Sequence, residues 1–157
     1  MKYIQLLILL FITTLFTLNA QEILSPNKNI KVVLQSKKTF GNLSSGQLFF
    51  KILYKNGSKY VEVLPDSPLG LSRADQRFTD NLKLIGETKA VALHDKYEMI
   101  CGKRKICENF GTEKVFRYTN STNQSLNIVF RAYNNGVAFR YIFPNHSDSL
   151  FNIINES

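Results

Sequence analysis

The chain has 157 residues, with 20 lysines and arginines against 12 aspartates and glutamates, which gives a formal net charge of +8. Without residues 1–20 it keeps 137 residues, enough for one domain with a single core but too few for a (β/α)8 barrel, which needs at least about 200. The basic residues are scattered apart from the run Lys103-Arg104-Lys105, so the composition favours an ordinary solvated surface and argues against nucleic-acid binding.

Residues 1–20 have the three parts of a secretory signal. Lys2 gives a positive start, an apolar stretch follows, and Ala20 places a small residue before the cut. A membrane-spanning helix needs about 20 apolar residues, so this shorter and interrupted run favours a cleaved signal over an uncleaved anchor. We therefore expect an exported protein that begins at Gln21 and has no membrane attachment after cleavage.

The mature chain predicts strands, because short apolar, β-branched and aromatic runs alternate with turn residues and no helical period is sustained. A strand is expected over 30–35, and Asn56-Gly57 predicts a hairpin between strands 48–54 and 60–64, the second ended by Pro65. Further strands are expected over 81–85, 88–100, 113–118, 126–133, 137–143 and 150–154, with tight turns over 120–125 and 134–136.

About eight or nine strands at this spacing are typical of an all-β antiparallel sandwich or open barrel. The last predicted strand stops at Ser157 with no closing element. A sandwich that stops there leaves an unpaired edge and uncovered apolar surface, so we expect the sandwich to be incomplete at its C-terminal edge.

Cys101 and Cys107 flank a run of five residues. In an oxidising compartment they can form a disulfide, provided that their Cα atoms come within about 7 Å, as at directly paired positions on adjacent strands. Two free, partly buried thiols are the alternative, and both stay open. A zinc site is not expected, because His94 and His146 show no ligand spacing with the cysteines.

No recognisable catalytic motif is found in the sequence. No acidic residue is marked as one of the paired carboxylates that glycosidic hydrolysis needs, and there is no G-x-S-x-G elbow, P-loop or dinucleotide-binding motif. A calcium-binding loop of the D-x-D-x-D-G kind is also missing. We therefore assign no catalytic residue and no metal ligand to this chain.

The segment 130–141 has the side chains best suited to binding. Arg131 and Arg140 carry rigid donor forks, Tyr133 carries a ring with a polar tip, and Asn134 and Asn135 lie in the predicted turn. These groups suit the hydroxyls and ring faces of sugars. The alternative is a structural hairpin whose arginines pair with carboxylates and whose tyrosines fill core edges. The pattern leaves the strand register open by one residue.

Residues 130–144, FRAYNNGVAFRYIFP, resemble the signature hairpin of the N-terminal domain of glycoside hydrolase family 97. The resemblance covers nearly all of the mature chain, residues 21–157, and the two cysteines are not part of the family pattern. The other landmarks agree in order, and they are Ser25-Pro26-Asn27, Ser67-Pro68-Leu69-Gly70-Leu71, Tyr97 followed by Gly102-Lys103-Arg104, and Glu113.

The resemblance implies a β-super-sandwich similar to galactose mutarotase, which in this family is the accessory domain of exported bacterial α-glucosidases and α-galactosidases. It implies a periplasmic or extracellular location. Family catalytic carboxylates and most calcium ligands lie in a central barrel, so calcium is expected in the full-length family but no ligand is carried over here. The sandwich packs on that barrel, and the five residues of the hairpin are expected to bind α-linked oligosaccharide or to face the barrel.

Because the chain stops before such a barrel, we expect a fragment of a glycosidase that has no hydrolytic activity alone. One alternative is a stand-alone exported carbohydrate-binding module. Another is an interaction subunit for a separately encoded barrel chain.

Overall fold

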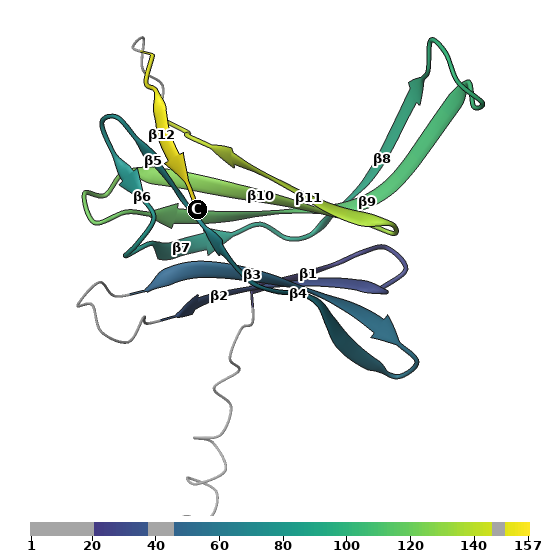
Figure 1. Cartoon of the computed structure of the whole chain (residues 1–157), viewed down its shortest axis with the longest axis horizontal. Coiled ribbons are helices and arrows are strands. Elements are labelled where there is room, and N and C mark those ends of the chain that lie inside the picture. The colour runs from purple at the N-terminus through teal and green to yellow at the C-terminus, as the bar shows by residue number, and fades with distance from the viewer. Residues whose placement is uncertain (1–20, 38–45, 146–149) are drawn as a thin grey trace, which may run out of the picture.

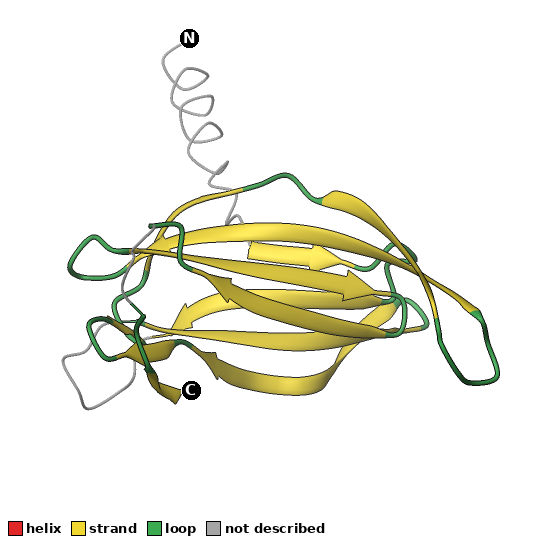
Figure 2. Ribbon diagram, turned by 90° about the horizontal axis from the view of Figure 1, so that it is seen from above, coloured by secondary structure: helices red, strands yellow, loops and turns green. Residues whose placement is uncertain are grey.

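The computed structural model describes residues 21–37, 46–145 and 150–157, so the predicted signal segment 1–20 and His146 lie outside the described residues. Regular elements in the described ranges are all strands, and the pairs of neighbouring strands are antiparallel. Figure 2 accordingly contains only strands and loops in this part of the chain. No described helix has the length and apolar character needed to span a membrane. The predicted all-β, antiparallel fold class is confirmed.

Two sheets lie face to face and a small third sheet lies at one end (Figure 1). The first is a meander of four neighbouring strands, β1 (Gln21–Leu24), β2 (Ile30–Lys37), β3 (Gln47–Asn56) and β4 (Lys59–Leu69). The facing sheet has the order β11 (Gly136–Ile142), β10 (Ser125–Tyr133), β9 (Ile106–Thr119) and β7 (Lys83–Glu87), with β8 (Val91–Glu98) also paired to β9. The third has the order β12 (Ile153–Glu156), β5 (Leu71–Arg73) and β6 (Arg77–Phe78).

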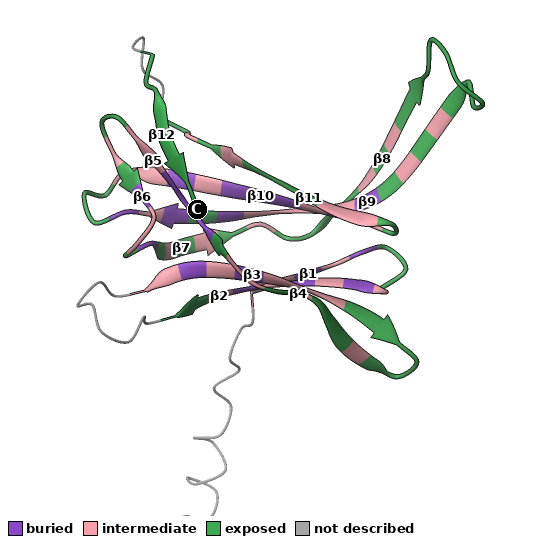
Figure 3. Ribbon diagram, viewed as in Figure 1, coloured by how far each residue is buried: buried purple, intermediate pink, exposed green. Residues whose placement is uncertain are grey.

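The core lies between the two larger sheets, as Figure 3 shows by the buried stretches on their strands. Alternate residues of β2 are buried, which is the pattern of a strand with one face on the core. Phe130 on β10 contacts Phe50 of the facing sheet, with 5.6 Å between ring centroids, and Phe116 of its own sheet, at 6.3 Å. The tilted contact between Phe50 and Phe130 joins the two layers.

The prediction that Pro65 ends its strand was wrong, since β4 continues to Leu69. The pairing shifts between Phe50 and Ile52 of β3, so that Pro65 and Asp66 fall in an irregularity of the ladder. A proline is tolerated at such a bulge because its missing N–H removes no ladder hydrogen bond there.

The strands expected over 88–100 and 113–118 have different bounds in the structure. β8 ends at Glu98, and β9 begins at Ile106 and runs for 14 residues. The extra residues of β9 pair with β8 from Val91↔Glu113 to Glu98↔Ile106. The result is a hairpin that projects from the sandwich and bends away from the β1–β4 sheet (Figure 1).

The last predicted strand, 150–154, forms only in part, because β12 begins at Ile153 and ends at Glu156; it pairs with β5 and not with β11. Among the described residues β11 therefore pairs only with β10 and leaves its other edge open. Leu150, Phe151, Ile153 and Ile154 are exposed next to this region of the fold. The expected uncovered apolar surface is thus present at the C-terminal side.

Candidate recognition face

The β10–β11 hairpin has a two-residue turn, Asn134-Asn135, and a single register. Arg131 pairs with Ala138, and Val129 pairs with Arg140. Directly paired residues share a face of a sheet, so Arg131 and Arg140 lie on the same face, with Tyr133 two positions beyond Arg131. This is the outer face, because the alternate residues Phe130 and Ala132 are buried in the core.

A shallow concavity of about 180 Å³ lies on this outer face. Its position brings together three of the five predicted residues, Arg131, Tyr133 and Arg140, and places the turn residues Asn134 and Asn135 outside it. Apolar side chains complete its wall, and the lining consists of Val129, Arg131, Tyr133, Ala138, Phe139 and Arg140.

Arg131 and Tyr133 are held by two carboxylates, Glu113 on the adjacent strand β9 and Asp95 on β8 beyond it. Arg131 Nε donates to Glu113 Oε2 at 2.7 Å, and Arg131 Nη1 lies 4.0 Å from Asp95 Oδ2. Tyr133 Oη donates to the same Asp95 oxygen at 3.0 Å. The hydrogen bond that Arg131 donates to Glu113 raises the pKa of Arg131 above its ordinary value. Arg131 therefore pairs with a carboxylate, as expected if the hairpin is structural.

Arg140 differs from Arg131, because it is exposed and forms no ion pair with any described residue. Asn134 is engaged differently, since its Oδ1 accepts a hydrogen bond from the backbone N–H of Asn27 at 3.0 Å. Asn135 is exposed beside Phe110 of β9. Of the five predicted residues, Arg131 and Tyr133 are therefore held by hydrogen bonds to carboxylates, and Arg140 has no ion pair with a described residue. The other two, Asn134 and Asn135, lie in the turn.

Two residues of this face were missed by the sequence analysis. Asp95 lies 38 positions from Tyr133 on β8, and no motif marks it. Gly111 lies opposite Tyr133, and a Cβ atom there would come within 2.8 Å of the Tyr133 ring. A glycine inside a strand indicates that another group approaches the backbone closely. Gly111 was therefore the one signal in the sequence for its contact with Tyr133.

Tyr141 extends the hairpin to the other sheet. Its hydroxyl accepts a hydrogen bond from the backbone N–H of Gly70, with 3.0 Å between Gly70 N and Tyr141 Oη. Gly70 has a φ of 141°, and a Cβ atom there would lie 2.4 Å from the carbonyl oxygen of Phe78, so only glycine fits. Three separate landmark segments of the sequence, those containing Asn27, Gly70 and Glu113, therefore contact one hairpin.

The two cysteines lie at the end of the projecting hairpin. Cys107 is opposite Tyr97 on β8, and Cys101 lies in the turn between the strands. They are not directly paired, and both are free cysteines in the structure. Their disulfide stays a prediction, which thiol counting with and without reductant tests. The described residues contain no group of three or more histidine, cysteine, aspartate or glutamate side chains placed to hold a metal ion.

The described residues form an antiparallel β-sandwich domain whose β10–β11 edge carries a shallow concavity on its outer face. The model of the family described as glycosyl-hydrolase 97 N-terminal matches residues 23–157, and the chain belongs to this family. A probable retaining alpha-galactosidase of Streptomyces bingchenggensis (strain BCW-1) is 31% identical over 85 residues, which are 54% of this chain and 13% of that protein.

Solved structures agree with the fold. Glycoside hydrolase family 97 enzymes from Pseudoalteromonas sp. strain K8, one in complex with panose and one with acarbose, superpose with a TM-score of 0.69 at 19% identity. Each match covers 86% of this chain and 19% of that chain. The chain therefore spans about a fifth or less of the length of the relatives that it matches.

Proposed function

We propose that the chain is the N-terminal accessory domain of an exported α-glycosidase, that the concavity on β10–β11 binds α-linked oligosaccharide, and that this chain supplies no catalytic residue. The observation that carries the proposal is the convergence of Arg131, Tyr133 and Arg140 on one outer face around an apolar wall. Family membership supports the first part, and the geometry of the face supports the second.

The chemistry of the face suits a neutral polyhydroxylated ligand. Sugars present hydroxyl groups around the ring and apolar C–H faces above and below it. Arg131 and Tyr133 are oriented in advance by Glu113 and Asp95, so little side-chain entropy is lost when a ligand binds. Arg140 retains all of its donors for hydroxyl oxygens, since no described carboxylate pairs with it.

A catalytic barrel domain is the proposed partner of the sandwich. The matched relatives are several times longer than this chain, and the solved ones are enzymes with oligosaccharide-type ligands in their complexes. Leu150 and Ile154 expose apolar surface that such a domain would cover. Calcium is proposed only for the full-length enzyme, and no ligand for it is assigned among the described residues.

The binding proposal is tested by titrating the protein with α-linked glucose and galactose oligosaccharides and following its amide NMR signals. We expect the largest shifts in β10, β11 and the adjoining part of β9. Arg140→Ala should weaken binding about fivefold or more, because it removes a charged hydrogen-bond donor. Arg77→Ala, at an exposed arginine of β6 in another sheet, is the matched control and should leave binding unchanged.

Two results would contradict the proposal. No shift with any of these sugars at millimolar concentration excludes the binding site. Hydrolysis of an aryl α-glucoside by the purified chain excludes the accessory, non-catalytic role.

The alternatives, a stand-alone carbohydrate-binding module and a subunit for a separately encoded barrel, share the same binding face. The DNA that follows codon 157 distinguishes them. A barrel in the same gene supports the accessory domain, and a separate barrel gene supports the subunit. If no barrel of either kind is found, the stand-alone module is supported.

A further inference from the structure

The outer face of the sheet continues without interruption onto the projecting β8–β9 hairpin. Along the ladder, Leu93 pairs with Gly111, which in turn pairs with Tyr133. Alternate residues of a strand share a face, so Asp95 and Tyr97 lie on the same face as Tyr133. The hydrogen bond between Tyr133 and Asp95 agrees with this assignment, and the hairpin bends toward this side (Figure 1).

The two faces of the hairpin differ in exposure. On the face shared with Tyr133, Leu93, Asp95, Cys107 and Asn109 are half-buried. On the opposite face the alternate residues are exposed, and Phe110 is 52% exposed and stacks on His94 with 4.4 Å between ring centroids. The bend of the hairpin therefore makes a concave, partly shielded surface on the side of the recognition face.

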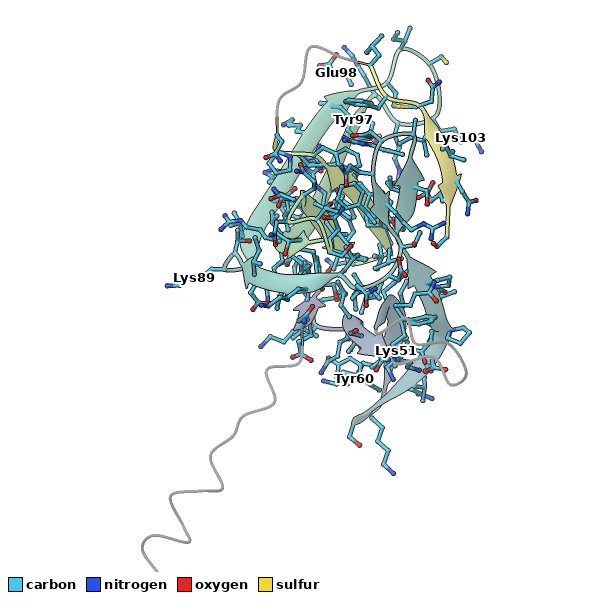
Figure 4. The ribbon with its side chains drawn as sticks, turned by 90° about the vertical axis from the view of Figure 1, so that its left-hand side faces the viewer. Lys51, Tyr60, Lys89, Tyr97, Glu98 and Lys103 are labelled. Carbon is cyan, nitrogen blue, oxygen red and sulfur yellow. The ribbon has the colours of Figure 1, made fainter. Side chains whose placement is uncertain are left out.

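Tyr97 presents a ring on this concave surface. It is 47% exposed and lies near the far end of the hairpin, well away from Lys51 and Tyr60 of the other sheet (Figure 4). Its partner Cys107 is four residues from Gly111 on β9, which places the Tyr97 position roughly 13 Å along the strand from the Tyr133 position. That separation is longer than a single sugar ring.

Asp95 lies between the two tyrosines. Its carboxylate has four acceptor sites, of which Tyr133 uses one. Its side chain is 41% exposed, so acceptor sites face solvent between two rings of the same kind. Carboxylate acceptors flanked by aromatic faces match the alternating hydroxyl and C–H surfaces of a sugar chain.

We propose that the binding site of the β10–β11 hairpin extends along the shared outer face onto β8, where Asp95 accepts hydroxyl hydrogen bonds and Tyr97 stacks on a further sugar ring. The ligand class is then an α-linked chain of three or more units rather than a single sugar. This inference rests on the proposed carbohydrate-binding function and adds its length preference and its second contact region.

The test compares ligand length in two aromatic variants of one hairpin. NMR or calorimetric titrations use methyl α-glucoside, maltotriose and maltohexaose, and in parallel methyl α-galactoside, raffinose and stachyose. Tyr97→Ala removes the ring on the concave face, and Phe110→Ala removes a similarly exposed ring on the opposite face. Circular dichroism checks that both variants keep the strand signal of the unaltered protein.

In one of the two series we expect the longer sugars to bind about tenfold more tightly than the methyl glycoside. Tyr97→Ala should remove most of this gain and leave the methyl glycoside affinity unchanged, whereas Phe110→Ala should keep the gain. The extension onto β8 is overturned by equal affinity for all lengths, by a gain that survives Tyr97→Ala, or by a gain that is lost in Phe110→Ala. In each of these cases, binding that still depends on Arg140 leaves the proposed function intact. No binding of any sugar overturns both.

Discussion

Gly70 and Tyr141 connect the end of the four-stranded sheet to the edge strand of the five-stranded sheet through one hydrogen bond, from Gly70 N to Tyr141 Oη at 3.0 Å. The two residues are 71 positions apart in sequence. Burial raises the pKa of the Tyr141 hydroxyl, so this group stays protonated throughout the neutral range.

Tyr141→Phe tests the contribution of this bond. The change keeps the ring and removes the acceptor, which leaves the N–H of Gly70 without its partner. We expect the free energy of unfolding to fall by about 1–2 kcal/mol in urea titrations. Tyr54→Phe, at an exposed tyrosine of β3, is the control and should change it by less than about 0.5 kcal/mol. Equal effects of the two changes would contradict the assigned role.

Gly111→Ala tests the close packing of Tyr133 on β9. The new methyl group would lie 2.8 Å from the Tyr133 ring, so the ring must move and its hydrogen bond to Asp95 must weaken. We expect a loss of about 1–3 kcal/mol in the free energy of unfolding. Gly86→Ala on β7 meets no atom within 4 Å and should be neutral or slightly stabilising. A neutral Gly111→Ala would show that the ring is not held against the strand.

A double-mutant cycle measures the pair formed by Arg131 and Glu113. Arg131→Gln, Glu113→Gln and the double variant should give a coupling energy of about 0.5–1 kcal/mol, because both side chains are partly shielded and the bond is short. The same cycle on the more exposed pair Lys96 and Glu108 should give a smaller value, near zero in high salt. The reverse order of the two coupling energies would contradict the prediction.

Asp75 is expected to make the C-terminal strand sensitive to acid. Its carboxylate accepts two hydrogen bonds from Arg73, at 2.8 and 2.6 Å, and the guanidinium lies 4.7 Å from the ring centroid of Phe151. The Arg73 hydrogen bonds hold the pKa of Asp75 below its ordinary 3.8. A lowered pKa means that its stabilising contribution is present above about pH 3.8 and is lost as the pH falls through the folded-state value.

The measurement is amide hydrogen exchange of residues 150–157 between pH 6 and pH 2.5, corrected for the intrinsic pH dependence of exchange. Protection should fall in the acid range in the unaltered protein. In Asp75→Asn it should already be low at pH 6 and should change little with pH. Full protection at pH 2.5 in both proteins would refute the link between Asp75 and the last strand.

The long strands that pack on the core, such as β2 and β10, were predicted well. The short core strands β1, β5 and β6 and the first part of β9 were not predicted. β2 and β10 alternate buried and less buried side chains, and their apolar pattern was visible in the sequence. The first part of β9, from Ile106 to Phe110, contacts no core layer and exposes both Ile106 and Phe110. Without a buried face no alternation is required, and the sequence gives no signal for that part of the strand.

For the recognition face, residue types were predictable and partners were not. Arg131 and Tyr133 stand out by their chemistry and by their place beside the turn. Their contact with Asp95 depends on the register of β8 against β9. That register could not be predicted, because a projecting hairpin has no core-facing apolar pattern that fixes it. Pro65 shows a similar limit, because the irregularity that accommodates it arises from the pairing with β3.

β9 passes through both parts of the molecule as one unbroken strand of 14 residues, roughly 46 Å in length. Phe116 near one end is fully buried in the core, while the other end forms one side of the projecting hairpin. β7 and β8 flank it end to end, and the break between them lies on one side only. Because the strand is continuous, we expect a displacement at the tip of the hairpin to be transmitted along β9 to the packing around Phe116.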